Sequence, residues 1–121
     1  MGHPAHHHKI NYIEFSASDV GKAKEFYGGV FGWKFQDYGP EYASFDHDSA
    51  GIDGGFRLGE TGGQAGGCAP LVVLYSADLK ATEDAVIAAG GAIVVPTFEF
   101  PGGRRFHFSD GLGNVLAVWS E

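Results

Sequence analysis

The feature that most constrains this chain is an internal repeat. Residues 10–58 read as a strand, a helix and three short strands, and residues 70–121 read as the same elements in the same order. A shift of 59 positions places Asp19, before the first helix pattern, on Asp78, before the second. The sequence therefore predicts an α+β fold of two βαβββ units in tandem, a cupped mixed β-sheet with helices on its outer face. Two unrelated halves that look alike by chance are the alternative.

Both helix patterns have clear boundaries. Asp19, or Ser18 before it, can accept hydrogen bonds from the free amides of the first helical turn. Gly32 is well placed to end that helix, and the repeat gives the same place to Gly91 in the second unit. Segments with strand character, bounded by Gly, Pro and Asp turns, make up the remaining elements. We expect strands at 10–16, 33–38, 41–46, 51–58, 70–76, 92–95, 104–109 and 114–120.

The length of 121 residues predicts one domain that buries a hydrophobic core. We expect this domain over residues 10–121, with the glycine-rich segment 59–69 as the link between the two units. Residues 1–9 hold four of the six histidines of the chain. This segment reads as a disordered terminus, partly from an expression tag, or as a metal-binding tail, because clustered imidazoles bind transition metals.

Charge and cysteine content bear on partners and location. The formal net charge of −7 repels phosphate, so a nucleic-acid partner is not expected. The single cysteine, Cys68, cannot form an intrachain disulfide, which fits a reducing compartment. No apolar stretch reaches the length of a membrane span, and the N-terminus lacks an apolar signal core. We therefore expect a cytoplasmic protein without membrane contact.

The strand patterns predict two sheet faces of opposite character, because alternate side chains point to opposite sides of a sheet. The apolar face is expected beneath the helices and consists of Ile13, Phe15, Ala43, Phe45, Val72, Leu74, Phe106, Phe108, Leu116 and Val118. The other face mixes rings with a few charges, which is typical of a concave site for a small molecule. Its predicted ligand-binding side chains are Tyr12, Tyr42, Phe56, Tyr75, Arg105 and Trp119. A face that is solvated or covered by a partner chain is the alternative.

Two segments resemble a known family. Residues 10–35, INYIEFSASDVGKAKEFYGGVFGWKF, resemble the opening of the vicinal oxygen chelate superfamily, which includes glyoxalase I, bleomycin-resistance proteins, fosfomycin-resistance enzymes and extradiol dioxygenases. Residues 106–119, FHFSDGLGNVLAVW, resemble its closing strand, turn and strand. The resemblance implies paired βαβββ modules that form a cup around a small organic molecule, commonly in a homodimer.

The same resemblance bears on metal binding. The family's catalysts hold a divalent metal with His, Gln or Glu from four strands. The matching positions here carry Tyr12, Leu71 and Ala117, and the internal repeat makes Gly54 the fourth. Leucine, alanine and glycine have no side-chain donor for a metal. We therefore predict no cofactor and a metal-free binding protein similar to the drug-sequestering branch. A divalent metal at displaced ligands is the alternative.

His107 and Glu14 are the candidate catalytic residues. Both are predicted on the mixed face, and a histidine can gain or lose a proton at cellular pH. Together they can serve as acid and base, or as metal ligands, in a lyase, isomerase or dioxygenase relative. A hydrogen-bonded histidine without catalytic duty is the favoured alternative. Arg105 can grip a carboxylate or phosphate of a ligand, or it can neutralise Glu14.

Overall fold

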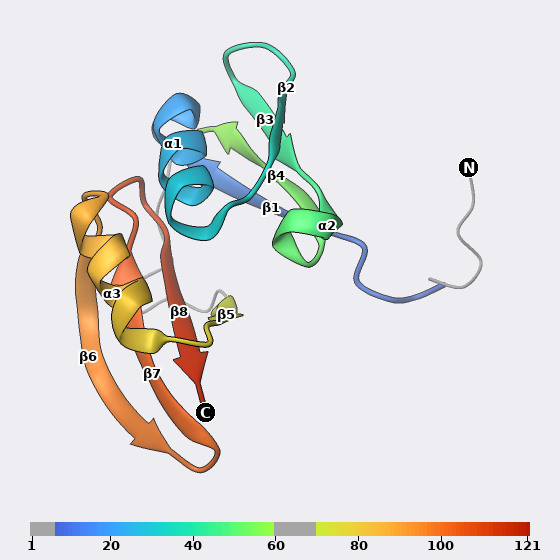
Figure 1. The fold of residues 1–121 in the computed structure, drawn as a ribbon. Coiled ribbons are helices and arrows are strands. Elements are labelled where there is room, and N and C mark those ends of the chain that lie inside the picture. Colours follow the sequence, from blue (N-terminus) through green and yellow to red (C-terminus); the bar gives the residue numbers. More distant parts are fainter. Residues whose placement is uncertain (1–6, 60–69) are drawn as a thin grey trace.

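The computed structural model describes residues 7–59 and 70–121, and its elements repeat in the predicted order (Figure 1). The first unit consists of β1 (Tyr12–Ala17), α1 (Val20–Phe31), β2 (Phe35–Asp37), β3 (Tyr42–Phe45), α2 (His47–Ala50) and β4 (Asp53–Leu58). The second consists of β5 (Val73–Tyr75), α3 (Leu79–Ala88), β6 (Ala92–Phe100), β7 (Gly103–Ser109) and β8 (Val115–Ser120). Most of the predicted tail 1–9 and nearly all of the predicted link 59–69 lie outside the described residues.

Each unit forms its own four-stranded mixed sheet, so the predicted tandem α+β fold is confirmed. The strand order is β1-β4-β3-β2 in the first sheet and β5-β8-β7-β6 in the second. In both sheets the first strand of the unit runs parallel to the last, and the other neighbours are antiparallel. Helices α1 and α3 contact each other, and each packs on its own sheet (Figure 1). No helix within residues 7–59 and 70–121 is long and apolar enough to cross a membrane.

The predicted aspartates begin both long helices. The Asp19 carboxylate accepts a hydrogen bond from the Lys22 amide at 3.0 Å, and the Asp78 carboxylate accepts one from the Ala81 amide at 3.1 Å. Each bond satisfies an amide that has no partner within the helix. The same side chain at the same position therefore sets the start of the helix in both units.

The ends of the two helices differ by one residue. Gly32 follows α1 in the left-handed conformation, with φ of 75°, as predicted. After α3 the left-handed residue is Gly90, with φ of 97°, and not the predicted Gly91. A side-chain carbon at Gly91 would lie 2.8 Å from Val86 and 3.0 Å from the Ser109 carbonyl oxygen. Glycine at position 91 thus permits close packing, whereas Gly90 makes the turn.

The apolar strand faces and the helices form one core that both units share. Phe26 and Phe31 of α1 reach the second unit, where each ring lies 5.9 Å from the ring of Phe108. The predicted apolar residues are buried or pack against the core: Phe15, Ala43, Phe45, Phe106, Phe108, Leu116 and Val118 are buried, and Ile13, Val72 and Leu74 lie at its margin. The prediction of a helix-covered apolar face is confirmed.

The closing turn ties the second unit to the first. The buried Asp110 carboxylate accepts hydrogen bonds from the Leu112 amide at 2.7 Å and from the Tyr27 hydroxyl of α1 at 2.9 Å. The Asn114 side chain donates to Asp110 at 3.1 Å and to the Ser16 carbonyl of β1 at 3.0 Å. Burial, followed by the negative charge of Asp110, raises the pKa of Tyr27, so its phenol stays protonated.

Two predictions on β4 are wrong by one residue of register. Phe56 lies beside Phe15 in the parallel pair, is fully buried, and faces the helices instead of the predicted binding face. Gly55 lies beside Glu14 on the opposite face, so Gly54 points toward the core. The connection through α2 is one residue longer than the closing turn, so the repeat needs a different offset here. A slip of one residue exchanges the two faces of a strand.

Two local features go beyond the predicted elements. Asp46 caps the short helix α2 by accepting a hydrogen bond from the Ser49 amide at 2.8 Å, in a segment where only a turn was expected. Strand β6 continues past the predicted end at residue 95 to Phe100. Its pairing with β7 is irregular between Val95 and Phe98, where Pro96 has no amide hydrogen to donate.

Candidate functional site

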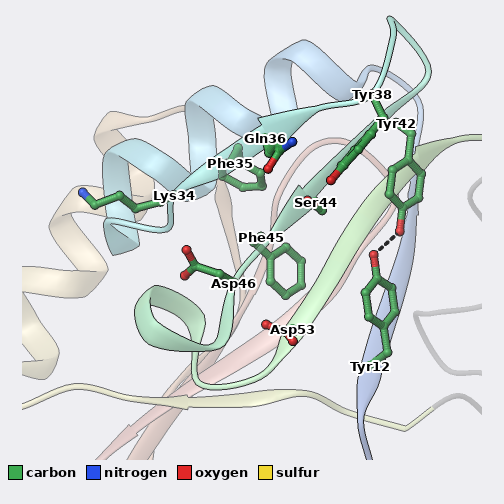
Figure 2. A pocket seen from close by; sticks show the side chains of 10 residues that line it. All are labelled: Tyr12, Lys34, Phe35, Gln36, Tyr38, Tyr42, Ser44, Phe45, Asp46 and Asp53. Atoms are coloured by element: carbon green, nitrogen blue, oxygen red, sulfur yellow. Dashed lines mark hydrogen bonds between the residues drawn. The ribbon is translucent and has the colours of Figure 1, made fainter. Parts of the chain in front are cut away.

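We call the helix-free sides of the two sheets the first face (β1 to β4) and the second face (β5 to β8). A chain of hydrogen bonds runs across the first face. The hydroxyls of Tyr12 and Tyr42 point at each other at 2.5 Å (Figure 2). The Tyr42 hydroxyl also donates to the Glu14 carboxylate at 3.2 Å, and Arg57 Nε donates to the same carboxylate at 3.1 Å. Glu14 therefore has its charge neutralised by Arg57 within its own unit.

Strand register brings these side chains together. Tyr42 lies directly opposite Arg57, and Glu14 lies beside Gly55. A side-chain carbon at Gly55 would collide with the Tyr42 hydroxyl, so glycine leaves room for the phenol to lie across β4. Burial, followed by the hydrogen bond with Tyr12, raises the pKa of Tyr42, which keeps this hydroxyl a donor to Glu14.

A hollow of about 480 Å³ opens on the first face (Figure 2). Its wall combines rings with donors and acceptors of both kinds, and consists of Tyr12, Lys34, Phe35, Gln36, Tyr38, Tyr42, Ser44, Phe45, Asp46 and Asp53. The volume falls within the range of small-molecule sites. The hollow therefore offers both apolar contact and hydrogen bonds to a ligand.

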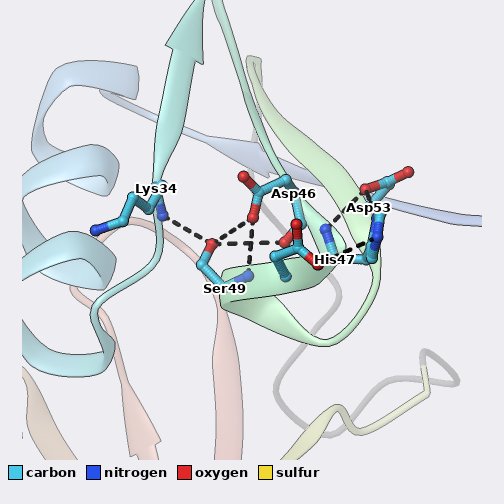
Figure 3. A network of polar contacts seen from close by, with 6 residues as sticks. Lys34, Asp46, His47, Ser49 and Asp53 are labelled. Atoms are coloured by element: carbon cyan, nitrogen blue, oxygen red, sulfur yellow. Dashed lines mark hydrogen bonds and ion pairs between the residues drawn. The ribbon is translucent and has the colours of Figure 1, made fainter.

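Asp46 and Asp53, on either side of α2, form the polar rim of this hollow, and both are bonded to α2 residues (Figure 3). The Asp53 carboxylate accepts hydrogen bonds from the His47 amide at 2.7 Å and pairs with His47 Nδ1 at 3.0 Å. Ser49 donates its hydroxyl to Asp46 at 2.7 Å and accepts the Lys34 amide at 2.9 Å. The hydrogen bond with Asp53 is the largest cause of the raised pKa of His47. The rim is thus held by its own local bonds.

The second face holds an arginine among rings. The Arg105 guanidinium lies 5.2 Å from the centre of the Phe98 ring and 5.5 Å from that of Phe100. Trp119 packs against Tyr75 at 5.1 Å and against Phe100 at 6.3 Å between ring centres. A second hollow, of about 350 Å³, is lined by Val73, Phe100, Pro101, Gly102, Arg105 and Trp119. Cation and rings are thus presented together on this face.

Two nitrogen atoms of the second face are buried without a partner. Among the described residues, neither Arg105 Nε nor His107 Nε2 makes a hydrogen bond. Buried nitrogen atoms without a hydrogen-bond partner are uncommon in folded proteins and often occur at functional sites. Burial, followed by the positive charge of Arg105, lowers the pKa of His107, so this imidazole is neutral at pH 7. Arg105 is therefore the sole charge that this face brings to its hollow from the residues that line it.

The structure groups the predicted site residues by unit. Tyr12 and Tyr42 line the first hollow, and Arg105 and Trp119 line the second. Tyr75 lies beside Trp119, donates its hydroxyl to Glu121 at 2.7 Å, and lines a cavity that also touches the first unit. Within the described residues, the hydrogen bonds and ring contacts of all these side chains stay inside their own unit.

The predicted pairing of Glu14 with His107 is absent within one described chain. Glu14 is bound by Tyr42 and Arg57, whereas the His107 ring lies 5.9 Å from that of Phe98. Of the two roles that the sequence leaves open for Arg105, neutralising Glu14 is not observed, because Arg57 forms that ion pair. Arg57 was not among the predicted site residues. It lies two positions after Gly55, and residues two apart in a strand point to the same face.

Phe98 and Phe100 of the second face were also missed in the sequence. They lie beyond residue 95, where the strand was expected to end. Their alternation with Glu99 is a strand pattern that continues after Pro96. The Arg105 guanidinium lies over both rings, so the longer strand contributes directly to the site.

The positions from which the family's catalysts hold a metal do not fit one here. The fourth of these positions is Gly55 and not the predicted Gly54. Gly55 pairs with Glu14 of β1 in the same way that Ala117 pairs with Val73 of β5. With Leu71 and Ala117, three of the four positions lack a donor atom, and the hydroxyl of Tyr12 is bonded to Tyr42. In residues 7–59 and 70–121, His, Cys, Asp and Glu side chains form no group of three or more suited to a metal ion.

Relatives in sequence agree with this architecture. The family model described as Glyoxalase/Bleomycin resistance protein/Dioxygenase superfamily matches residues 9–118. The chain is 26% identical over 124 residues to a protein of Mycobacterium tuberculosis named "Putative glyoxylase CFP32". That match covers 90% of this chain and 44% of the mycobacterial protein, so the chain spans less than half the length of its curated relatives.

Solved structures share the fold. A glyoxalase-related enzyme from Fulvimarina pelagi superposes with a TM-score of 0.76 at 18% identity, over 94% of this chain and 88% of that chain. The fosfomycin resistance protein FosX from Listeria monocytogenes superposes with a TM-score of 0.77 at 14% identity, over 94% and 91% of the two chains. With the two βαβββ units and a family match across nearly all of the sequence, the chain belongs to the glyoxalase/bleomycin resistance protein/dioxygenase superfamily.

Proposed function

We propose that this chain binds a small organic molecule on its helix-free faces and does so without a metal. One observation carries the proposal. The faces keep hollows lined by rings and a few polar groups, while the family's four metal positions supply a single hydroxyl that is already hydrogen-bonded. Rings provide apolar contact area and sparse polar groups fix orientation, which suits binding without chemistry.

Within this proposal the role of the chain is to sequester its ligand in the cytoplasm. Several structural neighbours are named as fosfomycin or bleomycin resistance proteins. At these identities the likeness supports the fold, and the resistance role is our extension of it. Sequestration requires a hollow of suitable shape and no reacting group.

We also propose that a second copy of the chain completes the site. Strands β1 and β5 are edge strands of their sheets within the described residues. They expose Tyr12, Val73 and Tyr75, whose exposed fractions are 45%, 42% and 54%. An open edge with exposed apolar side chains is a typical contact surface between chains. A homodimer that pairs the first face of one copy with the second face of the other would join the two hollows.

The competing function is a metal-dependent lyase, isomerase or dioxygenase with displaced ligands such as Glu14 and His107. Inside one chain these two side chains do not meet, since Glu14 is bound by Arg57 and His107 lies against Phe98. Neither residue has a neighbouring His, Cys, Asp or Glu group that would complete a metal site in the described ranges. We therefore favour binding over metal catalysis.

Elemental analysis and a ligand screen test the proposed function together. The full chain is used with His3, His6, His7 and His8 replaced by serine, so that the tail does not contribute metal. We expect far less than one metal ion per chain, and a rise in Tm with at least one member of a panel of organic acids, neutral aromatics, thiols and antibiotics. A stoichiometric metal that is lost in Glu14→Gln or His107→Gln would instead establish the competing function.

Sedimentation tests the proposed homodimer. We expect twice the chain mass of 12.8 kDa for the unaltered protein. Tyr75→Lys places a charge on the β5 edge and should shift the mass to that of a monomer. Ile87→Lys is the matched control, because Ile87 is equally exposed on α3, away from the strand edges. A monomer across the whole concentration range, or equal effects of both substitutions, would contradict the homodimer.

A further inference from the structure

The two faces place an aromatic ring opposite an arginine at corresponding positions. In the first sheet Tyr42 of β3 lies opposite Arg57 of β4. In the second sheet Arg105 of β7 lies opposite Trp119 of β8. The ring and the cation therefore have opposite places in the two units. Arg105 of β7 corresponds to Tyr42 of β3, and Trp119 of β8 corresponds to Arg57 of β4.

The carboxylate of the first face has no counterpart on the second. Glu14 lies beside Gly55 in β4, and the residue that lies beside Ala117 in the same place in β8 is Val73. Glu14 bonds to both side chains of the cation and ring pair on its own face. On the second face the position that corresponds to Glu14 holds Val73. This apolar side chain cannot neutralise Arg105.

Among the described residues, the positive charge of Arg105 has no ion-pair partner. The guanidinium lies over two phenyl rings, which places its charge beside apolar side chains. Within residues 7–59 and 70–121, its Nε is also buried without a hydrogen-bond partner. A buried nitrogen without a partner costs free energy unless a hydrogen-bond acceptor approaches it.

We infer that Arg105 receives the carboxylate of a flat, apolar organic acid whose body packs against Trp119 and Phe100. This inference rests on the proposed small-molecule binding and names the class of ligand. A guanidinium matches a carboxylate with two parallel hydrogen bonds. The remaining wall consists of Val73, Pro101, Gly102 and two rings and adds no second cation, which favours a singly charged acid over a phosphate.

Binding of 1-naphthoate tests the inference, with uncharged 1-naphthalenemethanol as the matched compound. Isothermal titration calorimetry is carried out on the full chain and on two variants. Arg105→Gln removes the proposed carboxylate partner, and Arg104→Gln makes the same charge change at the neighbouring residue, which points to the other side of β7. We expect naphthoate to bind at least about tenfold more tightly than the alcohol, because hydrogen bonds to charged groups carry most of the difference.

The variants should separate cleanly. Arg105→Gln should weaken naphthoate binding by about tenfold and leave the alcohol unchanged, while Arg104→Gln changes neither. Equal binding of acid and alcohol to every protein would overturn the ligand class and leave the proposed function standing. Binding of neither compound, with no hit in the wider screen, would overturn both. If Arg105→Gln does not fold, the comparison of the two compounds on the unaltered chain still decides between these outcomes.

Discussion

The first and second faces share one backbone plan and differ in how a positive charge is satisfied. On the first face Arg57 donates to Glu14 at 3.1 Å within a chain of hydrogen bonds that also includes Tyr42. On the second face Arg105 lies over the rings of Phe98 and Phe100, and the described residues give it no acidic partner. Two repeated units can thus share their strand pairing although the arginine of one has a carboxylate partner and the arginine of the other has none among the described residues.

This difference traces to a single position of the repeat. Glu14 in β1 corresponds to Val73 in β5, since they lie beside Gly55 and Ala117 in the same parallel pairing. The first face has a carboxylate at this position, which pairs with its arginine, and the second face has an apolar side chain there. Four predictions test how far the two faces, and the sheets beneath them, differ.

The largest effect should come from the glycine beneath the first face. Leu116 of the second sheet corresponds to Gly54, where an added side-chain carbon would collide with the Phe45 ring and the Ile13 carbonyl. Gly54→Ala should lower the free energy of unfolding by about 3 kcal/mol, measured by urea denaturation. In Gly29→Ala the new carbon meets nothing within 4 Å, so this helical control should be unchanged or stabilised by up to about 1 kcal/mol. Equal stability of both variants would refute the tighter packing of the first sheet.

The second prediction transfers the carboxylate of the first face to the second. Val73→Glu should place a carboxylate beside Arg105, as Glu14 lies beside Tyr42, and should weaken naphthoate binding by at least about tenfold. Calorimetry measures the change. Ile87→Glu adds the same charge on α3 and should leave binding within about twofold, since exposed distant charges are screened. Undiminished binding in Val73→Glu would show that Arg105 does not bind the carboxylate of the ligand.

A smaller effect is expected when the first face loses its counter-charge. Glu14→Gln should lower the free energy of unfolding by less than about 1 kcal/mol, because exposed ion pairs contribute little. The side chains of Glu14 and Arg57 are 43% and 53% exposed, so water can replace the lost contact. The difference between variant and unaltered chain should shrink further in concentrated salt. A much larger loss would mean that the hydrogen-bonded chain on this face supports the fold.

The smallest effect is a pair of opposite pKa shifts. The hydrogen bond with Asp53 raises the pKa of His47, while burial and Arg105 lower that of His107. NMR titration should therefore find His47 above and His107 below the ordinary histidine value of about 6.5. As the pH falls through this value, the unfolded chain takes up the His107 proton first, so acid should destabilise the folded state through His107. His107→Gln should remove that part of the acid sensitivity, and an unaltered profile would contradict the assignment.

Features that repeat over whole elements could be predicted from the sequence. The capping aspartates recur before both helices, and the alternation of apolar residues extends over several strands, so the order of elements and the buried face were correct. These signals are redundant, because several residues report the same face or boundary. The family resemblance rested on the same long patterns and is confirmed by the match over residues 9–118.

The details of the candidate site depend on single residues and could not be predicted in the same way. The prediction for Phe56 chose the wrong face because the connection through α2 is one residue longer than the closing turn between β7 and β8. The residue pattern of β4 alone does not show this shift. The sequence offers His107 and Arg105 of β7 as possible partners of Glu14, whereas β1 pairs with β4, and Arg57 of β4 binds this carboxylate. Which strands become neighbours is decided by tertiary pairing, which a strand's own pattern does not encode.

The closing turn has a consequence for the order in which the chain matures. The Tyr27 hydroxyl is buried against a carboxylate 83 positions further along the sequence. A ribosome exposes the first helix long before Asp110 leaves its tunnel, so during synthesis this phenol lacks the carboxylate that it binds in the folded chain. Sealing the α1 side of the core therefore has to wait until almost all of the second unit has been translated.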